Sequence, residues 1–443
     1  MNIKYWKGGE EMKKEKNFRV KQYHFYETDP MFPFLLLQLH FSKNLYNSTL
    51  YELRQALFKH ETIKNLDKVM KTKMSNRSDK PGFDYYQMAT VQSAQQTIAK
   101  AKSSMEYFFR SLKKYNENPT NYTGKPKPPK YKKGKYYIVT LTNQNCKVKG
   151  NMLHFPKKYG KDFVLNINDC FNNKEYDFVK LSEVRFYLRH GIIVLEVVYQ
   201  VKSKQTYSLR KNRICGIDLG VVNFAACSFN FNKSPILIDS SFIKSVNQKY
   251  NKKIAKCKSL AKKCNNLDNT KQIDALWFKR YRVIKDYMHK ASTFIIQECL
   301  KHRISKIVIG ENKGWKQHNQ NKQNFVYIPF NLFKQMIEYK AKLYGIKVIY
   351  IHESYTSGTS FLDNELPQKK FYNSNRRVQR GLFISNSGIA INDDINAGYQ
   401  MIKKYETKEN NKKRRMNKKL ISCFKDSLNW KLIASNVERV YIV

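Results

Sequence analysis

Long apolar stretches are missing from this sequence. A membrane-spanning helix needs about 20 predominantly apolar residues. The most apolar run, MFPFLLLQLHF at residues 31–41, is short and is interrupted by Pro33, Gln38 and His40. The opening MNIKYWKGGEEMKKEK carries charges with no apolar core behind them, unlike a signal peptide. These absences predict a cytoplasmic protein.

Cysteine pairs with the spacing of metal ligands are missing as well. None of the eight cysteines stands in a C-x-x-C pair. The two closest, Cys257 and Cys264, enclose KSLAKK, which is poor spacing for zinc. We interpret the cysteines as buried or free thiols in a reducing compartment.

Acidic residues are scarce. The chain has 35 Asp+Glu against 83 Lys+Arg, which gives a formal net charge of +48 at pH 7. Codon bias in an AT-rich genome raises Lys and Asn, but it would raise Asp and Glu too. The excess of positive charge therefore indicates a polyanionic partner, and nucleic acid is the main candidate. We accordingly expect a protein associated with the nucleoid.

The first half of the 443-residue chain predicts two long helices, a basic segment and a group of strands. Apolar residues recur at helical spacing over 33–60 and over 88–115. Segment 118–137, NPTNYTGKPKPPKYKKGKYY, is unsuited to a helix and is either a strap along a phosphate backbone or a solvated linker. Short strand patterns over 136–201 favour a small antiparallel barrel or sheet.

The second half alternates strands and helices. From about residue 213 the order is three strands, a long helical region at 243–301 that breaks near CNNLDNT, a strand, a helix, a strand and a last helix at 394–404. This order is typical of a central mixed sheet with helices packed on it.

The few acids of the second half stand at informative positions. Asp218 lies inside the apolar strand ICGIDLGVV, Glu311 follows KIVIG, and Asp393 and Asp394 precede the helix INAGYQMI. Each has an ordinary alternative: a turn acid, a surface salt bridge, or a helix cap. Acids on several elements of one sheet can also converge at the carboxyl ends of its strands. Carboxylates suit Mg²⁺, and two such ions can clamp a phosphoryl centre.

Four ordered motifs resemble the TnpB family, the RNA-guided nucleases of insertion sequences related to compact type V CRISPR effectors. The motifs are GIDLGVVNFAA, IVIGENKGWKQ, ESYTSGTSFLDNELP and RGLFISNSGIAINDDINAGYQMI. The resemblance extends to SKNLYNSTLYELRQ, ATVQSAQQTIAKAKSSMEYFFRSLKKY and GKPKPPKYK in the first half. It therefore covers nearly the whole chain.

The resemblance implies an α+β multidomain fold. We expect an RNase H-like α/β domain of the RuvC type, preceded by a helical recognition lobe and a small wedge-type β-barrel. The expected boundaries are 1–30 and 130–210 for the barrel, 31–129 for the helical lobe, 211–405 for the RuvC domain with an inserted loop at 352–390, and 406–443 for a basic tail.

The resemblance also implies a catalytic set. Asp218, Glu311 and Asp394 match the family's metal-binding acids, because Asp394 and Asn396 fit a D-x-N pattern that Asp393 does not fit. Asp393 is then a helix cap or a second negative charge. Arg380 matches a basic position near the scissile phosphate. The other predicted nucleic-acid contacts are Gln92, Gln95, Gln96, Lys125, Lys127 and Lys130, although the glutamines could equally be plain solvated surface.

One departure from the family concerns zinc. Many relatives hold a structural zinc with two C-x-x-C pairs between the second and third acidic motifs. The corresponding interval here, residues 353–383, contains no cysteine. We expect no zinc, and we expect the loop to be ordered by packing, with Phe361, Leu362 and Leu366 as a small core, or by nucleic acid.

The function implied by the resemblance is RNA-guided DNA cleavage. Guide RNA and double-stranded target DNA are the expected partners, Mg²⁺ is the expected cofactor with two ions, and a monomer is expected rather than a homodimer. A short motif beside the target would be read by the protein, and base pairing would supply the rest of the specificity. Two alternatives stay open: a nuclease-inactive RNA-guided DNA-binding repressor, and a transposon-end strand transferase.

Overall fold

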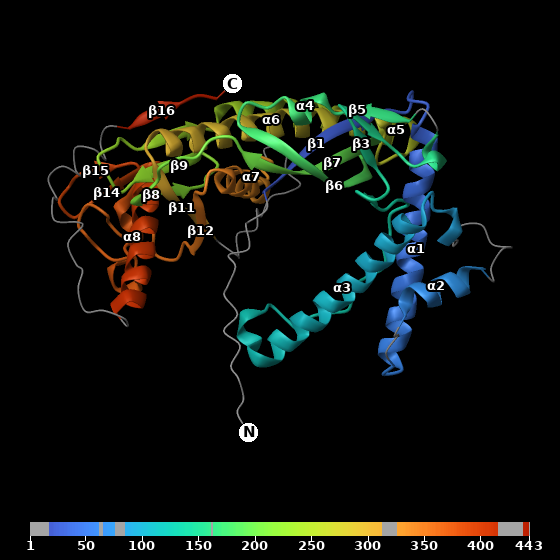
Figure 1. The fold of residues 1–443 in the computed structure, drawn as a ribbon. Coiled ribbons are helices and arrows are strands. Elements are labelled where there is room, and N and C mark those ends of the chain that lie inside the picture. Colours follow the sequence, from blue (N-terminus) through green and yellow to red (C-terminus); the bar gives the residue numbers. More distant parts are fainter. Residues whose placement is uncertain are drawn as a thin grey trace. The chain divides into compact units, whose positions relative to one another are not determined.

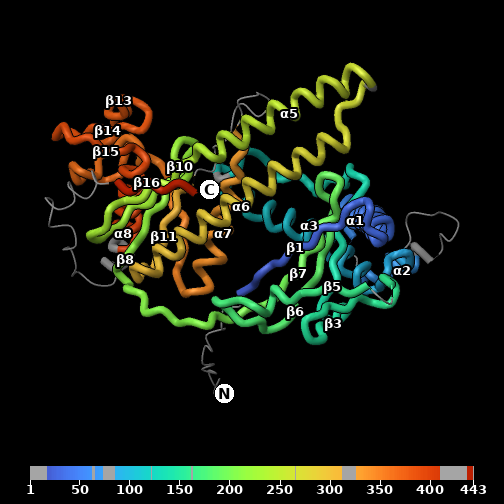
Figure 2. Tube along the Cα trace, turned by 90° about the horizontal axis from the view of Figure 1, so that it is seen from above, coloured from blue at the N-terminus to red at the C-terminus, as the bar shows by residue number. Residues whose placement is uncertain are grey.

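The computed structural model describes residues 17–61, 65–75, 85–160, 163–311, 326–414 and 437–442. The end of the motif IVIGENKGWKQ and part of the predicted tail lie outside these ranges. The chain forms two compact units, one that ends at Lys204 and one that begins at Gln205. Figures 1 and 2 trace both units in sequence colours. Helices and sheets occur in each, so the predicted α+β class is confirmed.

The larger of the two sheets in the first unit has four antiparallel strands (Figure 1). Its strands, in spatial order, are β1 (Asn17–Phe25), β7 (Ile192–Ser203), β6 (Tyr176–Arg189) and β2 (Val139–Thr142). In β7 the consecutive residues 193–197 are all buried, and burial alternates only after them, with Tyr199 and Val201 buried and Val198 and Gln200 half-buried. The predicted antiparallel sheet is confirmed, and β1, from the N-terminal segment that was grouped with it, joins it by pairing along β7.

A second, smaller antiparallel sheet lies in the same unit. It consists of β3 (Lys147–Lys149), β4 (Met152–His154) and β5 (Val164–Asn166), in that order. No strand of one sheet pairs with a strand of the other among the described residues. The strands of this unit therefore form two open sheets and not a closed barrel there.

The predicted helices of the first half are confirmed as α1 (Phe32–Phe58) and α3 (Val91–Glu117). A shorter helix, α2 (Leu66–Ser75), lies between them in sequence. Thr90 begins α3 by accepting a hydrogen bond from the amide of Ser93 at 3.1 Å, which is why the helix starts three residues later than predicted. The two long helices pack through a shared cluster that consists of Tyr46, Leu50, Ala101 and Met105.

The basic segment 118–137 is extended, as predicted, and lies along α1. Asn47 of α1 donates to the carbonyl of Lys132 at 3.0 Å and accepts from the same residue's amide at 2.8 Å. Arg54 donates to the carbonyl of Pro129 at 3.2 Å. The segment is therefore held by α1 through its backbone, and its lysine side chains need not take part.

The second unit has a six-stranded mixed sheet, which confirms the predicted central sheet. Its order is β12 (Lys347–His352), β11 (Ile304–Glu311), β8 (Arg210–Asp218), β9 (Asn223–Phe229), β10 (Ile236–Asp239) and β16 (Glu438–Val440). The strands β12, β11 and β8 are parallel to one another, whereas β9 is antiparallel to β8. The carboxyl ends of the three parallel strands therefore meet at one edge.

Helices cover both faces of this sheet. The helices are α5 (Ser241–Asn265), α6 (Lys271–Lys301), α7 (Phe330–Leu343) and α8 (Asp393–Arg414). Helices α6 and α7 pack on the face that carries Ile217, Ile307 and Ile309. Helix α8 packs through Met401 and Ile402 on the face with Ile214 and Val308. None of the helices within the described ranges is long and apolar enough to cross a bilayer.

Two features of the second unit differ from the sequence-based expectation. Helix α8 continues to Arg414, because the polar residues after Tyr405 are good helix formers although they add no apolar stripe. Strand β16 pairs in parallel with β10, so part of the segment predicted as a basic tail belongs to the sheet. A three-residue strand that pairs with a distant partner leaves no periodic signal in the sequence.

The inserted loop carries its own small sheet. It consists of β13 (Arg377–Gln379), β14 (Leu382–Ile384) and β15 (Ala390–Ile391), joined by antiparallel pairing. Phe361 is buried in a cluster with Phe383, Ile395 and Tyr399, and Leu362 packs against this cluster. The predicted small core thus forms through Phe361 and Leu362, whereas Leu366 is half-buried.

Candidate active site

Two glycines bring α8 close to the middle of the sheet. A Cβ atom on Gly216 of β8 would lie 2.4 Å from the carbonyl oxygen of Gly398 on α8. A Cβ atom on Gly398 would lie 2.5 Å from Oγ of Ser228 on β9. Because neither residue has a side chain, the helix lies directly on β8 and β9. The first turn of α8 therefore reaches the end of β8, where Asp218 is the last residue.

Asp394 is fixed from two sides in this first turn. The Asn392 side chain accepts hydrogen bonds from the amides of Asp394 at 3.1 Å and Ile395 at 3.3 Å, and so caps the helix. Asn223, at the start of β9, donates to Oδ2 of Asp394 at 2.8 Å. Asp393 contributes to the cap as well, because its Oδ1 atom accepts from the amide of Asp394 at 2.9 Å, and the Asp394 carboxylate faces the β8–β9 connection.

Asp218 and Asp394 lie close enough to affect each other's ionisation. Burial raises the pKa of Asp218 well above its ordinary value, and the negative charges of Asp394, Glu353 and Asp393 raise it further. Burial also raises the pKa of Asp394, followed by the charge of Asp393, while Asn223 and two arginines act in the opposite direction. The site is a concentration of negative charge, which favours binding of a cation.

Asp393 makes contacts quite different from those of Asp394. It is buried, and its Oδ2 atom accepts a hydrogen bond from Arg377 at 2.6 Å. Arg377 begins β13, so this ion pair attaches the inserted loop to the start of α8. Asp393 also contributes negative charge beside Asp218 and Asp394.

Arg380 lies near the acids, and its contact with a phosphate stays a prediction. It is exposed, and its charge is one of those that lower the pKa of Asp394. Arg377 was not singled out by the sequence, although it contacts Asp393 directly. The dipeptide Arg376-Arg377 was the available signal, but sequence alone does not tell which arginine of a basic loop faces an acid.

Glu311 is not brought onto the same face of the sheet as Asp218. It is the last residue of β11, where side chains alternate between faces. Ile307 and Ile309 contact the core on the α6–α7 face, so Glu311 follows them to that face. Its negative charge contributes there to raising the pKa of Tyr350 to about 12, after burial and Glu338. Within the described ranges, no three His, Cys, Asp or Glu side chains are close enough to form a metal cluster.

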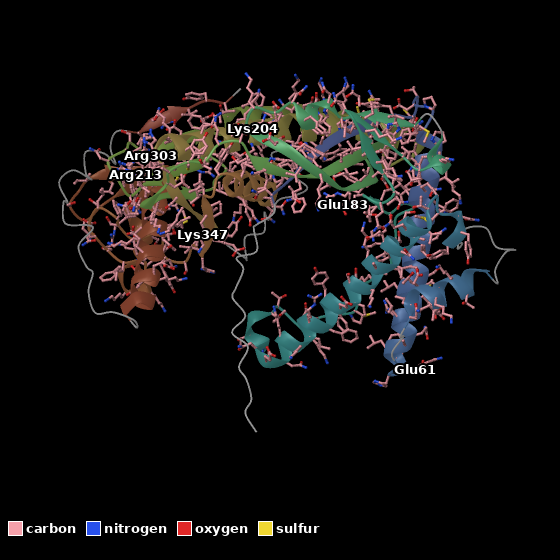
Figure 3. The ribbon with its side chains drawn as sticks, in the orientation of Figure 1. Glu61, Glu183, Lys204, Arg213, Arg303 and Lys347 are labelled. Carbon is pink, nitrogen blue, oxygen red and sulfur yellow. The ribbon has the colours of Figure 1, made fainter. Side chains whose placement is uncertain are left out.

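The parallel strands carry opposite charges at their two ends. Arg213 lies in the first half of β8, Arg303 directly precedes β11, and Lys347 begins β12 (Figure 3). The backbones of β8 and β11 are joined at this end by a hydrogen bond from the amide of Arg210 to the carbonyl of Arg303 at 2.8 Å. The acids Asp218 and Glu311 lie at the carboxyl ends. The length of the strands therefore separates these three cations from the acidic edge.

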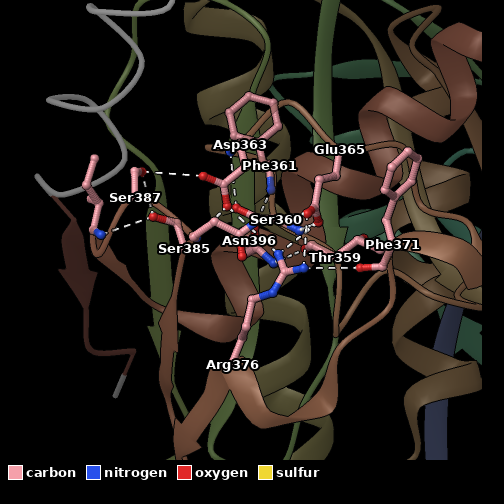
Figure 4. A network of polar contacts seen from close by, with 12 residues as sticks. Thr359, Ser360, Phe361, Asp363, Glu365, Phe371, Arg376, Ser385, Ser387 and Asn396 are labelled. Atoms are coloured by element: carbon pink, nitrogen blue, oxygen red, sulfur yellow. Dashed lines mark hydrogen bonds and ion pairs between the residues drawn. The ribbon is translucent and has the colours of Figure 1, made fainter.

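A buried ion-pair network holds the cysteine-free loop (Figure 4). Arg376 donates two hydrogen bonds to Glu365, at 2.9 and 3.0 Å, and lies 3.8 Å from Asp363. Glu365 also accepts from the amide of Ser360 at 2.7 Å, and Asp363 accepts from the amide of Asn386 at 2.7 Å. One arginine and two carboxylates thus hold together three parts of this loop. In many relatives a zinc ion is expected to hold the corresponding loop.

Asn396, the second residue of the D-x-N pattern, points into this loop. Its Oδ1 atom accepts from the amide of Phe361 at 2.9 Å, and its Nδ2 atom donates to the carbonyl of Thr359 at 2.8 Å (Figure 4). Asn396 is fully buried. It therefore joins the loop to the helix that carries Asp394.

The predicted nucleic-acid contacts of the first unit are mostly accessible. The three lysines of the basic segment, Lys125, Lys127 and Lys130, are exposed. Gln95 is exposed, whereas Gln92 and Gln96 are half-buried, and Gln92 donates to Gln144 at 2.7 Å. The three lysine side chains are thus accessible to a nucleic acid. The hydrogen bond to Gln144 gives Gln92 a structural role, which explains in part why a glutamine stands there.

Comparison with known families points to the same relationship. A family model described as "Probable transposase" (OrfB_IS605) matches residues 196–316, which include Asp218 and Glu311. A model described as "Cas12f1-like, TNB domain" matches residues 330–401, which include the inserted loop and Asp394. These two regions of the chain are similar to TnpB and Cas12f proteins.

Two curated relatives agree with this relationship. The CRISPR-associated endodeoxyribonuclease Cas12f2 of a Micrarchaeota archaeon is 30% identical over 249 residues, which are 52% of this chain and 41% of that protein. A TnpB-like protein of Methanocaldococcus jannaschii is 37% identical over 86 residues, which are 17% of this chain and 29% of that protein. The matched stretches thus span less than half the length of either relative.

Solved structures of Cas12f proteins are similar only at a low level. A chain titled as a Cas12f1–sgRNA–target DNA complex aligns with 83% of this chain and 82% of its own length, with a TM-score of 0.47 and 17% identity. A CRISPR–Cas12f ternary complex aligns with a TM-score of 0.36 and 15% identity. Scores of this size do not establish a shared fold.

Proposed function

We propose that this chain is an RNA-guided DNA endonuclease. The observation that carries the proposal is the pair Asp218 and Asp394, two carboxylates that lie near each other at the carboxyl edge of the central sheet, where Glu353 and Asp393 add further negative charge. The relationship to Cas12f2, a protein named as an endodeoxyribonuclease, supports the choice of DNA as substrate. In this proposal the second unit is an RNase H-like nuclease domain of the RuvC type.

The donor set fits Mg²⁺. Two half-buried carboxylates near each other repel unless a cation lies between them, and Mg²⁺ takes oxygen ligands and keeps several waters. Asp218 and Asp394 would hold the metal, and Glu311, whose side chain lies on the other face at the end of β11, is the third ligand that the family resemblance implies. When bound, two such ions would activate the attacking water and stabilise the leaving 3′ oxygen.

The chain's own residues would do the positioning. Asn223 orients the Asp394 carboxylate through the 2.8 Å hydrogen bond, and Asn392 fixes the helix turn on which Asp394 lies. Arg380 is exposed beside these acids and would contact the phosphate to be cut. Buried Asn396 would keep the inserted loop and α8 in one arrangement during the reaction.

The excess of basic charge would bind the nucleic acids. Guide RNA and the guide–target heteroduplex would be held through their phosphates, which needs many cations and no sequence-specific contacts. The exposed Lys125, Lys127 and Lys130 of the extended segment would contribute, while the first unit would form the recognition lobe and wedge and would read a short motif in the target DNA. We propose a monomer in the cytoplasm.

The identity of the RNA tests the guided part of this proposal. The full chain is purified from cells that carry its own locus, and the RNA that remains bound is sequenced. A single defined species encoded beside the gene or in a CRISPR array is expected. A mixture of random fragments would contradict a guided mechanism.

A strand transferase is the second candidate, and the family model described as a probable transposase favours it. It predicts joining of transposon ends to target DNA without any guide. Incubation of the RNA-free protein with end-containing DNA and Mg²⁺ separates the two functions. Joined products support the transferase, whereas their absence together with guide-dependent cleavage supports the endonuclease. A nuclease-inactive repressor would bind guided targets and leave them uncut.

A further inference from the structure

A carboxylate that the sequence did not single out stands at the same edge as Asp218. Glu353 directly follows β12, just as Glu311 ends β11 and Asp218 ends β8. These strands are adjacent and parallel, in the order β12-β11-β8. Three neighbouring strands therefore each deliver an acid to the same end of the sheet, where sites form in open α/β sheets.

Strand register places Glu353 on the face of Asp218. Ile309 pairs with Ile217, so the next residues, Gly310 and Asp218, lie side by side on strands about 4.8 Å apart. A Cβ atom on Gly310 would lie 2.3 Å from Oε1 of Glu353 and 2.8 Å from Sδ of Met401 on α8. The Glu353 carboxylate therefore occupies the space that a side chain at position 310 would fill, on the α8 face.

The backbone around Glu353 is held firmly. Lys404 of α8 donates to the carbonyls of His352 and Ser354, both at 2.9 Å, and to Oγ of Ser354 at 3.0 Å. The amide of Glu353 donates to the carbonyl of Glu311 at 3.4 Å, and Thr356 donates its hydroxyl to the carbonyl of Glu353 at 2.8 Å. The side chain is thus presented by a fixed backbone and not by a free loop.

The nearest cation has another partner. Lys334 of α7 donates from Nζ to the carbonyl of Gly310 at 2.7 Å. Burial raises the pKa of Glu353, and the charges of Lys334 and then His352 act in the opposite direction. If Glu353 were only one half of a structural salt bridge, its carboxylate would contact the Lys334 ammonium group directly. Lys334 instead donates its hydrogen bond to the carbonyl of Gly310.

We propose that Glu353 is a further metal-binding carboxylate beside Asp218, an inference that rests on the proposed nuclease function. It would hold the metal through a water of hydration, since Mg²⁺ retains several waters and the side chains of the described residues do not form a closed cage. The acids on this face would then be Asp218, Asp394 and Glu353. Gly310 is required because any side chain there would displace Glu353.

Metal affinity of the RNA-free, full-length protein tests the inference. Mn²⁺ serves as the probe, with titration followed by calorimetry and by the paramagnetic resonance signal of free Mn²⁺. Glu353→Gln keeps the shape and is expected to weaken binding about tenfold, the usual effect of removing an outer ligand. Glu353→Asp, which keeps the charge, is expected to recover part of the affinity. Wild-type affinity in Glu353→Gln would overturn the inference.

The matched control is Glu338→Gln. Glu338 is exposed on α7 and accepts a hydrogen bond from Tyr350 at 3.2 Å, so it offers the same substitution away from the α8 face. Its Mn²⁺ affinity is expected to equal that of the wild type. An equal loss in Glu338→Gln and Glu353→Gln would mean that overall charge, and not the site, sets the affinity, which would also overturn the inference.

Failure of the inference is distinguishable from failure of the proposed function. Asp218→Asn is expected to lose Mn²⁺ binding by at least a hundredfold. Loss in Asp218→Asn with full binding in Glu353→Gln contradicts only the role of Glu353. Absence of Mn²⁺ binding by the wild-type protein contradicts the metal site itself and the nuclease with it.

Discussion

Asp393 and Asp394 are adjacent in sequence but have different environments. Asp394 receives a hydrogen bond from Asn223 and lies beside Asp218, whereas Asp393 is buried and paired with Arg377. The choice of Asp394 over Asp393 as a metal ligand came from the D-x-N pattern of the family that the sequence resembles, and it stays a prediction. The ion pair of Asp393 depends on a loop that no local pattern describes.

The two aspartates are expected to respond differently to the same substitution. Asp394→Ala should abolish cleavage and leave the melting temperature unchanged or higher, because it removes a charge that is repelled by its neighbours. Asp393→Ala should lower cleavage only several-fold and cost about 1–2 kcal/mol of stability through the lost pair with half-exposed Arg377. Plasmid cleavage and thermal unfolding of both variants check this. Equal loss of cleavage would contradict the assignment.

The ionisation of Asp218 gives a prediction about metal removal. Its pKa is raised by burial and by acidic neighbours, so the unfolded chain releases this proton at lower pH than the folded chain. The free energy of unfolding therefore decreases as the pH rises from the ordinary pKa of Asp toward the raised pKa of Asp218. At neutral pH the metal-free protein is less stable by this amount. Asp218→Asn removes the cost.

We expect Asp218→Asn to raise the melting temperature in EDTA by about 2–5 °C and to eliminate the stabilisation that Mg²⁺ gives the wild type. Thermal unfolding in EDTA and in Mg²⁺ measures both effects. A lower melting temperature in EDTA, or a Mg²⁺-dependent rise as large as in the wild type, would contradict the electrostatic account of the site.

At the scale of elements, the helices that could be predicted from the sequence are those whose ends are marked by nearby turn or capping residues. The break between α5 and α6 was predicted from CNNLDNT, and in the structure Asn266 is left-handed with φ of 49° and Thr270 caps α6. Strand β16 and the length of α8 were not predicted, because they depend on pairing and packing with distant residues. The face of Glu311 was not predicted either, since a shift of one residue along a strand reverses its direction.

The inserted loop shows how a charge network can order a segment without metal. Arg376→Met leaves Glu365 and Asp363 buried without their partner, a change that costs about 3–5 kcal/mol. We expect the loop 353–385 to lose protection from hydrogen exchange and DNA cleavage to fall, while RNA binding stays intact. Lys369→Met, at an exposed position in the same loop, is the control. Unchanged exchange in Arg376→Met would show that the network does not hold the loop.

The packing of α6 against α7 predicts an acid-sensitive contact. Burial, followed by the charges of Lys340 and Lys285, lowers the pKa of His289 to about 4, and Asp286 offsets this only in part. Lys340 also donates to the His289 carbonyl at 2.7 Å, and the Tyr339 hydroxyl lies 3.5 Å from Nδ1. Between about pH 6.5 and 4 the unfolded chain binds a proton that the folded chain does not, so stability is lost as pH falls.

His289→Gln is expected to remove on the order of 2 kcal/mol of this acid destabilisation, after allowance for partial exposure of the ring. Thermal unfolding of the wild type and the variant at pH 7 and pH 4.5 measures the difference. His154→Gln, which changes a histidine of β4, is the control. Parallel pH profiles for wild type and His289→Gln would show that another group is responsible.

At the scale of the whole molecule, net charge and the order of motifs carried most of the functional prediction. A charge of +48 favours a polyanionic partner, and the acids of the second half stand out because the chain has so few. The two matched family regions, 196–316 and 330–401, both fall largely in the second unit. The first unit would bind RNA and read the target, but its sequence contains few patterns that identify which residues do so.

The most direct test of the central claim is cleavage of plasmid DNA by the protein–RNA complex in Mg²⁺. The plasmids carry a sequence complementary to the bound RNA, next to a randomised flanking segment. We predict linear products only from plasmids with the complementary sequence and a restricted set of flanking motifs, and no products with Asp394→Ala. Cleavage that does not depend on complementarity, or an intact plasmid pool with the wild-type complex, would contradict the account.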